Sequence, residues 1–326
     1  MNLRTVTTGI LGVAMALFAA FPMNAKSQDA ESVMVMEAHS GKVLFAVNST
    51  QRRPVASLAK MATAAVAIDW ATATRVEIGD TMITVPQTIT RVGGPNPMNL
   101  QPGERLSLRD ALFASMLGSD NLAALSIADH VGREILRARG RQGDPAAAFV
   151  AEMNQLARAL GMSHTRFNNP HGLDRPRNPG ATSTAADMAR LSVYVMRKPP
   201  LTFITRQTER RIHVTGAGGR RSFLVRNTNE LAGGEGVLGI KTGTTRAAGP
   251  CLATCVERDP IVRTMPDGSR GVTPRRLIIV VLNHPDRFGR TRGLIRQGWA
   301  AYDHWFQGGA RVENPRRELL QVPDLE

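Results

Sequence analysis

The chain has 326 residues, of which 41 are lysine or arginine and 27 are aspartate or glutamate, giving a formal net charge of +14. Such a surplus can mark a nucleic-acid binder, but the arginines are scattered and no stripe of interleaved aromatic residues accompanies them, which argues against that class. We expect the charge to attract an anionic surface or carboxylate-bearing substrates. The two cysteines, Cys251 and Cys255, would lie about 13 Å apart along a strand, too far for a disulfide, so both are expected in the core.

The amino terminus has the pattern of an export signal. Arg4 precedes the apolar segment Gly9–Phe21, and a candidate cleavage site follows Ala25. The apolar segment is short for a membrane span. We therefore expect residues 1–25 to be a signal peptide and the mature protein to lie in the periplasm or cell envelope, either soluble or tethered only by an uncleaved signal.

Strands and a helix are expected directly after the signal. Two β-like runs, Ser32–Ala38 and Lys42–Asn48, are joined by a tight polar turn and predict a hairpin. A helix is expected to start near Ser57. A short β-rich stretch at 75–85 and a loop rich in glycine and proline, Gly93–Glu104, follow that helix.

Helices dominate the middle of the chain. Ser107 and Asp110 form a capping box before the apolar run that begins at Leu108. The sequence GSDN at residues 118–121 breaks this run, and a long loop precedes residue 185. The expected helices start at Leu108, run from the GSDN break to about Arg139, and span Asp144–Gly161 and Ala185–Arg197.

The second half of the chain is rich in β-like runs, namely "RRIHV", "RSFLV", "GIKTG", "PCLATCV" and "RLIIVVLNH". Between the last two runs, the polar stretch Glu257–Arg276 predicts a long hairpin loop. An amphipathic helix from about Arg290 to Phe306 and a short polar tail, 310–326, end the chain. Strands at both ends with helices between them indicate an α+β fold with an antiparallel sheet of about five strands flanked by helices.

Ser57 and Lys60 lie one helical turn apart at the start of an alanine-rich segment. Residues i and i+3 share a face of a helix, so the hydroxyl and the amine can meet. The positive end of the helix dipole and partial burial both favour the neutral amine. A neutral Lys60 could act as the general base that activates Ser57 as a nucleophile. The alternative is an incidental pair on a helix.

The GSDN sequence is a second candidate motif. Ser119 could relay a proton to a leaving amine, and the Asn121 amide could bind both a substrate carbonyl and Lys60. The alternative is an ordinary helix N-cap supplied by Ser119 or Asp120.

The sequence "GIKTGTT" is the third candidate motif and is expected on an edge strand. Gly243 would let a substrate backbone approach closely. Lys241 would keep Lys60 neutral and attract a carboxylate, and the N–H groups of Thr244 and Ser57 could form an oxyanion hole. S-x-x-K, S-D-N and K-T-G in this order are the signature of serine enzymes that interact with penicillin.

On these motifs, and on blocks such as "ASLAKMATA", "NPHGLD", "STAADMARL" and "RNTNEL", the chain resembles the D-alanyl-D-alanine carboxypeptidases of the low-molecular-mass penicillin-binding class, peptidase family S11. The resemblance runs from about Ser32 to Phe306. It implies a β-lactamase/transpeptidase-like fold in a serine DD-peptidase catalytic domain at 26–309, with an all-helical subdomain at roughly 70–190.

The resemblance also implies a reaction and its residues. The enzyme would remove the terminal D-Ala from peptidoglycan stem peptides through an acyl-enzyme on Ser57, β-lactams would inhibit it covalently, and no metal, cofactor or nucleic acid would take part. The implied catalytic residues are Ser57, Lys60, Ser119 and Asn121. The implied substrate-binding residues are Lys241, Thr242, Gly243, Thr244, Arg226 and Arg290.

Three features depart from the usual pattern of the family. Asp120 stands where carboxypeptidases of this class usually have glycine, which leans toward endopeptidase-like members or β-lactamases. Thr244 stands where some members have histidine, and the tail is too short and polar for the family's second domain and membrane anchor. The alternatives are a DD-endopeptidase that cleaves crosslinks, a β-lactamase, and a cell-wall binding module without catalysis.

Overall fold

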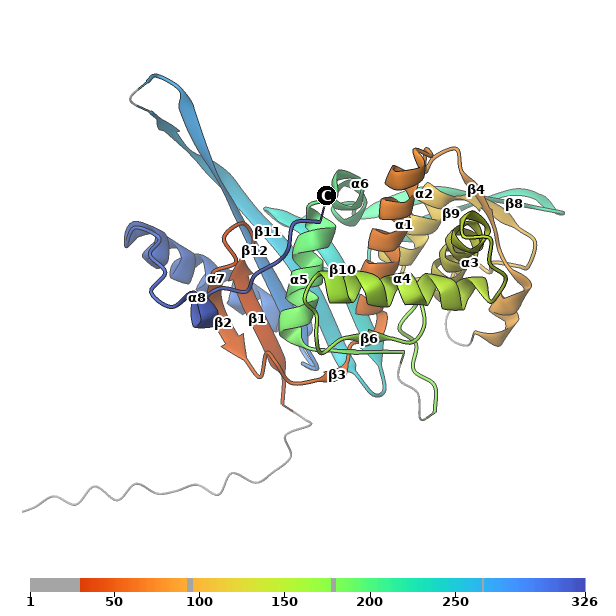
Figure 1. The fold of residues 1–326 in the computed structure, drawn as a ribbon, viewed down its shortest axis with the longest axis horizontal. Helices are drawn as coiled ribbons and strands as arrows, with labels where there is room; N and C mark the ends of the chain where they lie inside the picture. The colour runs from red at the N-terminus through yellow and green to blue at the C-terminus, as the bar shows by residue number, and fades with distance from the viewer. Residues whose placement is uncertain (1–29, 93–95, 177–179, 266, 326) are drawn as a thin grey trace, which may run out of the picture. The chain divides into compact units, whose positions relative to one another are not determined.

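A five-stranded antiparallel sheet organises the fold in the computed structural model, which describes residues 30–92, 96–176, 180–265 and 267–325. Its strand order is β10-β11-β12-β1-β2, so strands from the two ends of the chain are neighbours (Figure 1). The strands are β1 (Ser32–Glu37), β2 (Val43–Val47), β10 (Val237–Thr245), β11 (Gly249–Thr264) and β12 (Arg270–Leu282). The predicted α+β class and five-stranded sheet are confirmed. The predicted signal peptide, 1–25, lies outside the described residues.

The sheet is buried on both faces because its central strands are apolar on both faces. Val33 and Val35 of β1 pack in one cluster with Trp299 of α7 (Arg287–Gln307). Met34 and Met36 point to the opposite face, as alternate strand residues must, and join the larger core that includes α5 (Ala185–Met196). The predicted hairpin of β1 and β2 and the predicted last helix are both present.

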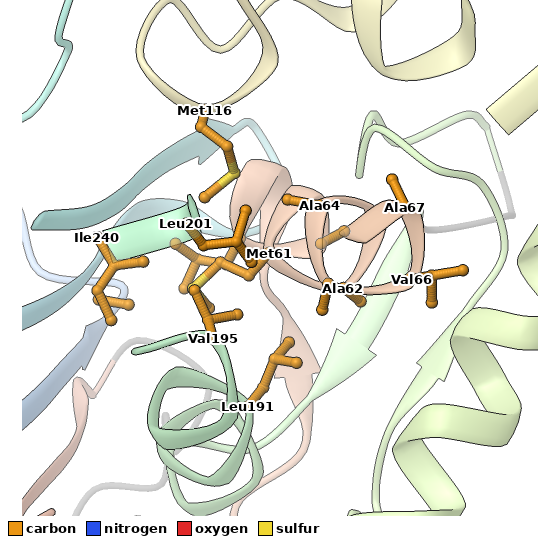
Figure 2. Close-up of a cluster of buried hydrophobic side chains, with 14 of the residues drawn as sticks. Met61, Ala62, Ala64, Val66, Ala67, Met116, Leu191, Val195, Leu201 and Ile240 are labelled. Atoms are coloured by element: carbon orange, nitrogen blue, oxygen red, sulfur yellow. The ribbon is translucent and has the colours of Figure 1, made fainter. Parts of the chain in front are cut away.

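The helix that follows Ser57 is surrounded by other elements. A 3-10 turn, η1 (Ala56–Ala59), leads into α1 (Lys60–Thr74), whose first nine residues are all buried. Figure 2 shows Met61 of α1 packed near Val195 of α5, Leu201 of α6 (Pro199–Thr205) and Ile240 of β10. A helix that is apolar on all sides belongs in the core, and its alanines let the neighbouring helices approach closely.

Further helices lie beside α1 (Figure 1). These are α2 (Leu108–Met116), α3 (Asn121–Ala138) and α4 (Pro145–Ala159). Their starts agree with the sequence prediction: Ser107 caps α2 by accepting a hydrogen bond from the Asp110 N–H, and Asp120 and Asp144 cap α3 and α4. Within the described part of the chain, no helix is long and apolar enough to cross a bilayer.

Two smaller sheets form apart from the main sheet. One has the order β4-β5-β8-β9, and the other has the order β3-β7-β6. Their strands and the remaining short helices are β3 (Arg53–Pro54), β4 (Met82–Thr84), β5 (Arg105–Ser107), β6 (Arg166–Phe167), β7 (Ala181–Ser183), β8 (Glu209–Gly216), β9 (Gly219–Arg226), η2 (Gln87–Arg91) and α8 (Pro315–Glu318). The predicted strands "RRIHV" and "RSFLV" therefore pair with each other outside the main sheet.

The prediction of a hairpin loop at Glu257–Arg276 is wrong. Strands β11 and β12 stay paired through this stretch, from Glu257 opposite Arg276 to Thr264 opposite Arg270. The result is a long two-stranded ribbon that extends away from the sheet (Figure 1). The many polar residues of this stretch suggested a loop. The strand pattern lies in the β-branched residues that alternate with them, such as Val262, which pairs with Val272 across the ribbon.

The described part of the tail, 310–325, packs against the rest of the fold. Leu320 is only 8% exposed, and its N–H donates to the Gly41 carbonyl over 2.8 Å. Glu318 forms an ion pair with Lys42. The tail is therefore tied to the turn between β1 and β2.

Candidate active site

Ser57 and Lys60 meet at the junction of η1 and α1. The Lys60 Nζ lies 2.9 Å from the Ser57 Oγ. Side chains three residues apart eclipse one another in a 3-10 turn, which accounts for this contact. Ala56, one residue before the serine, has a left-handed φ of 50°. The loop residue Gly172 lies so close to this backbone that a Cβ on it would fall 2.0 Å from the Ala56 carbonyl oxygen.

Lys60 is completely buried, with 0% exposure, and all three of its hydrogen-bond partners are uncharged. Besides Ser57, its Nζ donates to the Asn121 Oδ1 over 2.8 Å and to the His171 carbonyl over 2.7 Å. Burial lowers the pKa of Lys60 to about 7, and the negative charge of Asp120 opposes this decrease. The main cause is therefore burial, which the sequence predicted together with the helix dipole and the charge of Lys241. A large fraction of Lys60 is neutral at neutral pH and can accept a proton.

The GSDN sequence lies between α2 and α3. Ser119 is half-buried and has a left-handed φ of 58°. Asp120, not Ser119, is the N-cap: its Oδ1 accepts hydrogen bonds of 2.8 Å from the N–H groups of Leu122 and Ala123. The structure thus brings the Asn121 side chain onto Lys60 and leaves Ser119 in the adjacent turn.

Strand β10 forms the edge of the sheet beside the serine. A Cβ on Gly243 would lie 3.0 Å from the Ser57 nitrogen and 3.2 Å from the Ala56 Cβ. A glycine at this position therefore allows the strand to pack against η1. Its neighbour Thr242 is buried, and the Thr242 hydroxyl lies 2.6 Å from the Thr228 hydroxyl. Thr244, one residue further on, is exposed.

Lys241 is buried, with 1% exposure, and its Nζ donates to the Thr242 carbonyl over 3.1 Å. Burial first, and then repulsion from Lys60 and Arg287, lower the pKa of Lys241 well below its ordinary value. Lys241 lies two residues before Gly243 on the strand that packs against η1, and Lys60 follows η1 directly, so the two amines come from adjoining elements.

The two predicted arginines pair with carboxylates that lie outside this strand. Arg290 donates to both carboxylate oxygens of Glu31 over 2.7–3.0 Å. Arg226, at the end of β9, is exposed and lies 3.8 Å from Glu209, its partner on β8. Among the described residues, neither arginine forms a hydrogen bond or an ion pair with β10.

A third arginine, missed in the sequence, contacts β10. The Arg287 Nη1 donates to the Gly243 carbonyl over 2.9 Å and to the Thr244 Oγ1 over 2.8 Å. Arg287 and Arg290 are one turn apart on α7, and Asp286 caps the helix at its start. Asp286 was the signal that could have pointed to Arg287. An aspartate cap marks the start of a helix, so it places Arg287 in the first turn of α7, which is the turn that contacts β10.

His171 contributes its main chain to this site. Burial and the nearby positive charges of Lys60 and Arg175 lower the pKa of its imidazole to about 3, so the ring is neutral. Its Nδ1 accepts a hydrogen bond from the Leu173 N–H. Among the residues that the structure describes, no group of three His, Cys, Asp or Glu side chains is arranged to hold a metal ion.

The sequence profile of peptidase family S11, described as D-alanyl-D-alanine carboxypeptidase, matches residues 19–262. The class defined by this fold and these motifs is thus that of the penicillin-interacting serine peptidases. Within it, the chain belongs to the peptidase S11 family of D-alanyl-D-alanine carboxypeptidases.

Individual relatives agree with this family. The chain is 32% identical over 291 residues to the D-alanyl-D-alanine carboxypeptidase DacC of Escherichia coli, which covers 86% of this chain and 64% of the relative. It is 30% identical over 261 residues to a D-alanyl-D-alanine endopeptidase of Pseudomonas aeruginosa, covering 77% of each chain. The chain spans slightly less than two thirds of the length of the curated carboxypeptidases DacC and DacF.

Solved structures support the predicted transpeptidase-like fold. The Streptomyces K15 DD-transpeptidase superposes with a TM-score of 0.67 at 22% identity, over 82% of this chain and 96% of that chain. Penicillin-binding protein D2 of Listeria monocytogenes, solved in an ampicillin-bound form, has a TM-score of 0.63 at 27% identity, over 82% and 96%.

Proposed function

We propose that the protein is a serine-type DD-carboxypeptidase that removes the terminal D-Ala from peptidoglycan stem peptides. The observation that carries the proposal is the contact between the Ser57 hydroxyl and the buried Lys60 amine, whose pKa is lowered to about 7. A neutral amine in hydrogen-bond contact with a serine is the arrangement that serine acylation requires.

The D-Ala-D-Ala end of the substrate would lie along Lys241–Thr244 of β10, the edge strand of the main sheet. Its carboxylate would bind the Thr242 hydroxyl and the Arg287 guanidinium, since arginine is charged at every relevant pH and suits a carboxylate. An incoming carboxylate would also favour the charged form of Lys241. Because of its contacts with β10, we assign to Arg287 the role that the sequence gave to Arg290. We give Arg226 no role in holding the carboxylate.

In the first step, the Ser57 Oγ attacks the carbonyl between the two D-alanines and its proton passes to the Lys60 Nζ. The N–H groups of Ser57 and Thr244 stabilise the negative oxygen that forms. The C–N bond then breaks, and the leaving amine of D-Ala takes a proton through Ser119. Asn121 holds the substrate carbonyl and Lys60, and water finally hydrolyses the ester on Ser57.

We further propose that the protein is exported, acts in the periplasm or cell envelope, and binds β-lactams covalently. Export is supported by the signal pattern in the sequence, and β-lactam binding by the ampicillin-bound form of the Listeria monocytogenes protein. The second candidate function is a DD-endopeptidase. It is favoured by Asp120 in the second motif and by the similarity to the endopeptidase of Pseudomonas aeruginosa.

The test is to incubate the protein with a labelled penicillin and to measure its intact mass. We expect a long-lived adduct that is absent in Ser57→Ala. Rapid turnover would indicate a β-lactamase, and the absence of an adduct would indicate a non-catalytic module. Release of D-alanine from a monomeric pentapeptide, compared with cleavage of crosslinked dimers, separates the carboxypeptidase from the endopeptidase.

A further inference from the structure

Asp120 is a buried carboxylate beside the candidate active site that the proposed reaction does not use. Its side chain is 1% exposed. The Oδ1 accepts two backbone N–H groups at the start of α3, whereas the Oδ2 is buried and has no hydrogen-bond partner among the described residues. A buried acceptor without a partner costs stability, so its presence calls for an explanation.

The position of Asp120 ties it to Lys60. The two capping bonds fix the carboxylate at the N-terminus of α3, and the next residue, Asn121, receives the hydrogen bond from the Lys60 Nζ. The direct partners of Lys60 are uncharged oxygens. Lys60 must become an ammonium ion when it takes the proton of Ser57, and a buried ammonium ion without a counter-charge is costly.

Other titratable groups near Lys60 offer it no counter-charge. The Lys241 amine on β10 and Lys60 repel each other when both are charged, Arg287 on α7 adds to the positive charge near Lys241, and the His171 ring in the loop is neutral. Asp120 is the negative charge that acts on Lys60 and opposes the effect of its burial.

We propose that Asp120 is a positioning residue of the active site: its carboxylate orients Asn121 through the α3 cap and supplies the negative charge that stabilises the Lys60 ammonium ion during acylation. This inference rests on the proposed function. It gives a physical reason for a buried acid where carboxypeptidases of this class usually have glycine.

The test is Asp120→Asn, which removes the charge but keeps an oxygen that can accept the two capping bonds. The matched control is Asp144→Asn, because Asp144 caps α4 through its Oδ1 in the same way and is exposed. The rate of acylation by a penicillin is measured from pH 5 to pH 9. For Asp120→Asn we expect the acid midpoint of the profile to move to lower pH by about one unit and the plateau to fall by about tenfold.

A second readout does not depend on activity. The chain contains only five lysines, so lysine-selective labelling gives few side-chain NMR signals, and Lys60→Met assigns the signal of Lys60. Asp120→Asn should lower the titration midpoint of Lys60, and Asp144→Asn should not. A midpoint of Lys60 that is unchanged in Asp120→Asn would overturn the proposal, even if the plateau falls. A wild-type protein that forms no penicillin adduct, but whose Lys60 midpoint depends on Asp120, would instead contradict the carboxypeptidase function.

Discussion

The contact between Gly243 and Ser57 gives the sharpest quantitative prediction. In Gly243→Ala, the new methyl group would lie 3.0 Å from the Ser57 nitrogen and 3.2 Å from the Leu58 nitrogen. Both neighbours are main-chain atoms, so β10 and η1 must separate by a few tenths of an ångström. A displacement of 1 Å in an active site can cost about 100-fold in rate, so we expect kcat/KM for acylation to fall by roughly 10- to 100-fold.

The assay is the second-order rate constant of acylation by a fluorescent penicillin, with thermal unfolding measured in parallel. The control is Gly293→Ala on α7, where an added Cβ would meet no atom within 4 Å. The control should acylate at the wild-type rate. If Gly243→Ala also acylates within about twofold of wild type, the spacing between β10 and η1 does not govern the reaction.

Three further predictions concern other parts of the molecule. Arg287→Ala should lower kcat/KM for D-alanine release from a pentapeptide by about 10- to 100-fold, whereas Arg290→Ala should change it by about twofold or less, because Arg287 donates hydrogen bonds to β10 and Arg290 pairs with Glu31; equal losses would contradict the assignment. The pKa of Lys60 is lowered to about 7 from an ordinary value of 10.5, so the folded state binds fewer protons than the unfolded state between these values and stability rises with pH there. Denaturant unfolding from pH 7 to pH 10 should show that Lys60→Met reduces this slope and raises the free energy of unfolding at pH 7 by about 2 kcal/mol. The same variant should not be acylated by penicillin. An unchanged slope would mean that the amine is not held neutral. Deleting residues 315–326 should lower the melting temperature by about 5 °C with acylation retained, because the deletion exposes the surface that Leu320 covers; an unchanged melting temperature would show that the tail contributes no stability.

Much of the fold could be predicted from the sequence because the patterns that indicate its helices and strands are local. The capping box at Ser107 and Asp110 marks the start of α2, and the apolar runs of β1 and β12 give buried strands. Three motifs of a few residues each predicted a serine and two lysines near one another. The structure has Lys60 in contact with Ser57, and Lys241 on the strand that packs against η1.

The features that the sequence did not predict are ones that local patterns do not determine. Arg287 and Arg290 differ by one helical turn, and only the packing of α7 decides which guanidinium contacts β10 and which pairs with Glu31. The ribbon at Glu257–Arg276 is polar because it leaves the core, so its pairing depends on register and not on burial. The tail binds through long-range contacts, such as those of Leu320 with Gly41 and of Glu318 with Lys42, which no local pattern indicates.

The pairing of β1 with β12 places residue 32 opposite residue 282. During translation, the central sheet therefore cannot close until nearly the whole chain has left the ribosome. Contacts between such distant residues slow folding. The serine-bearing segment is synthesised early, and it must wait for β10, made some 180 residues later, before the nascent polypeptide can assemble a reactive centre.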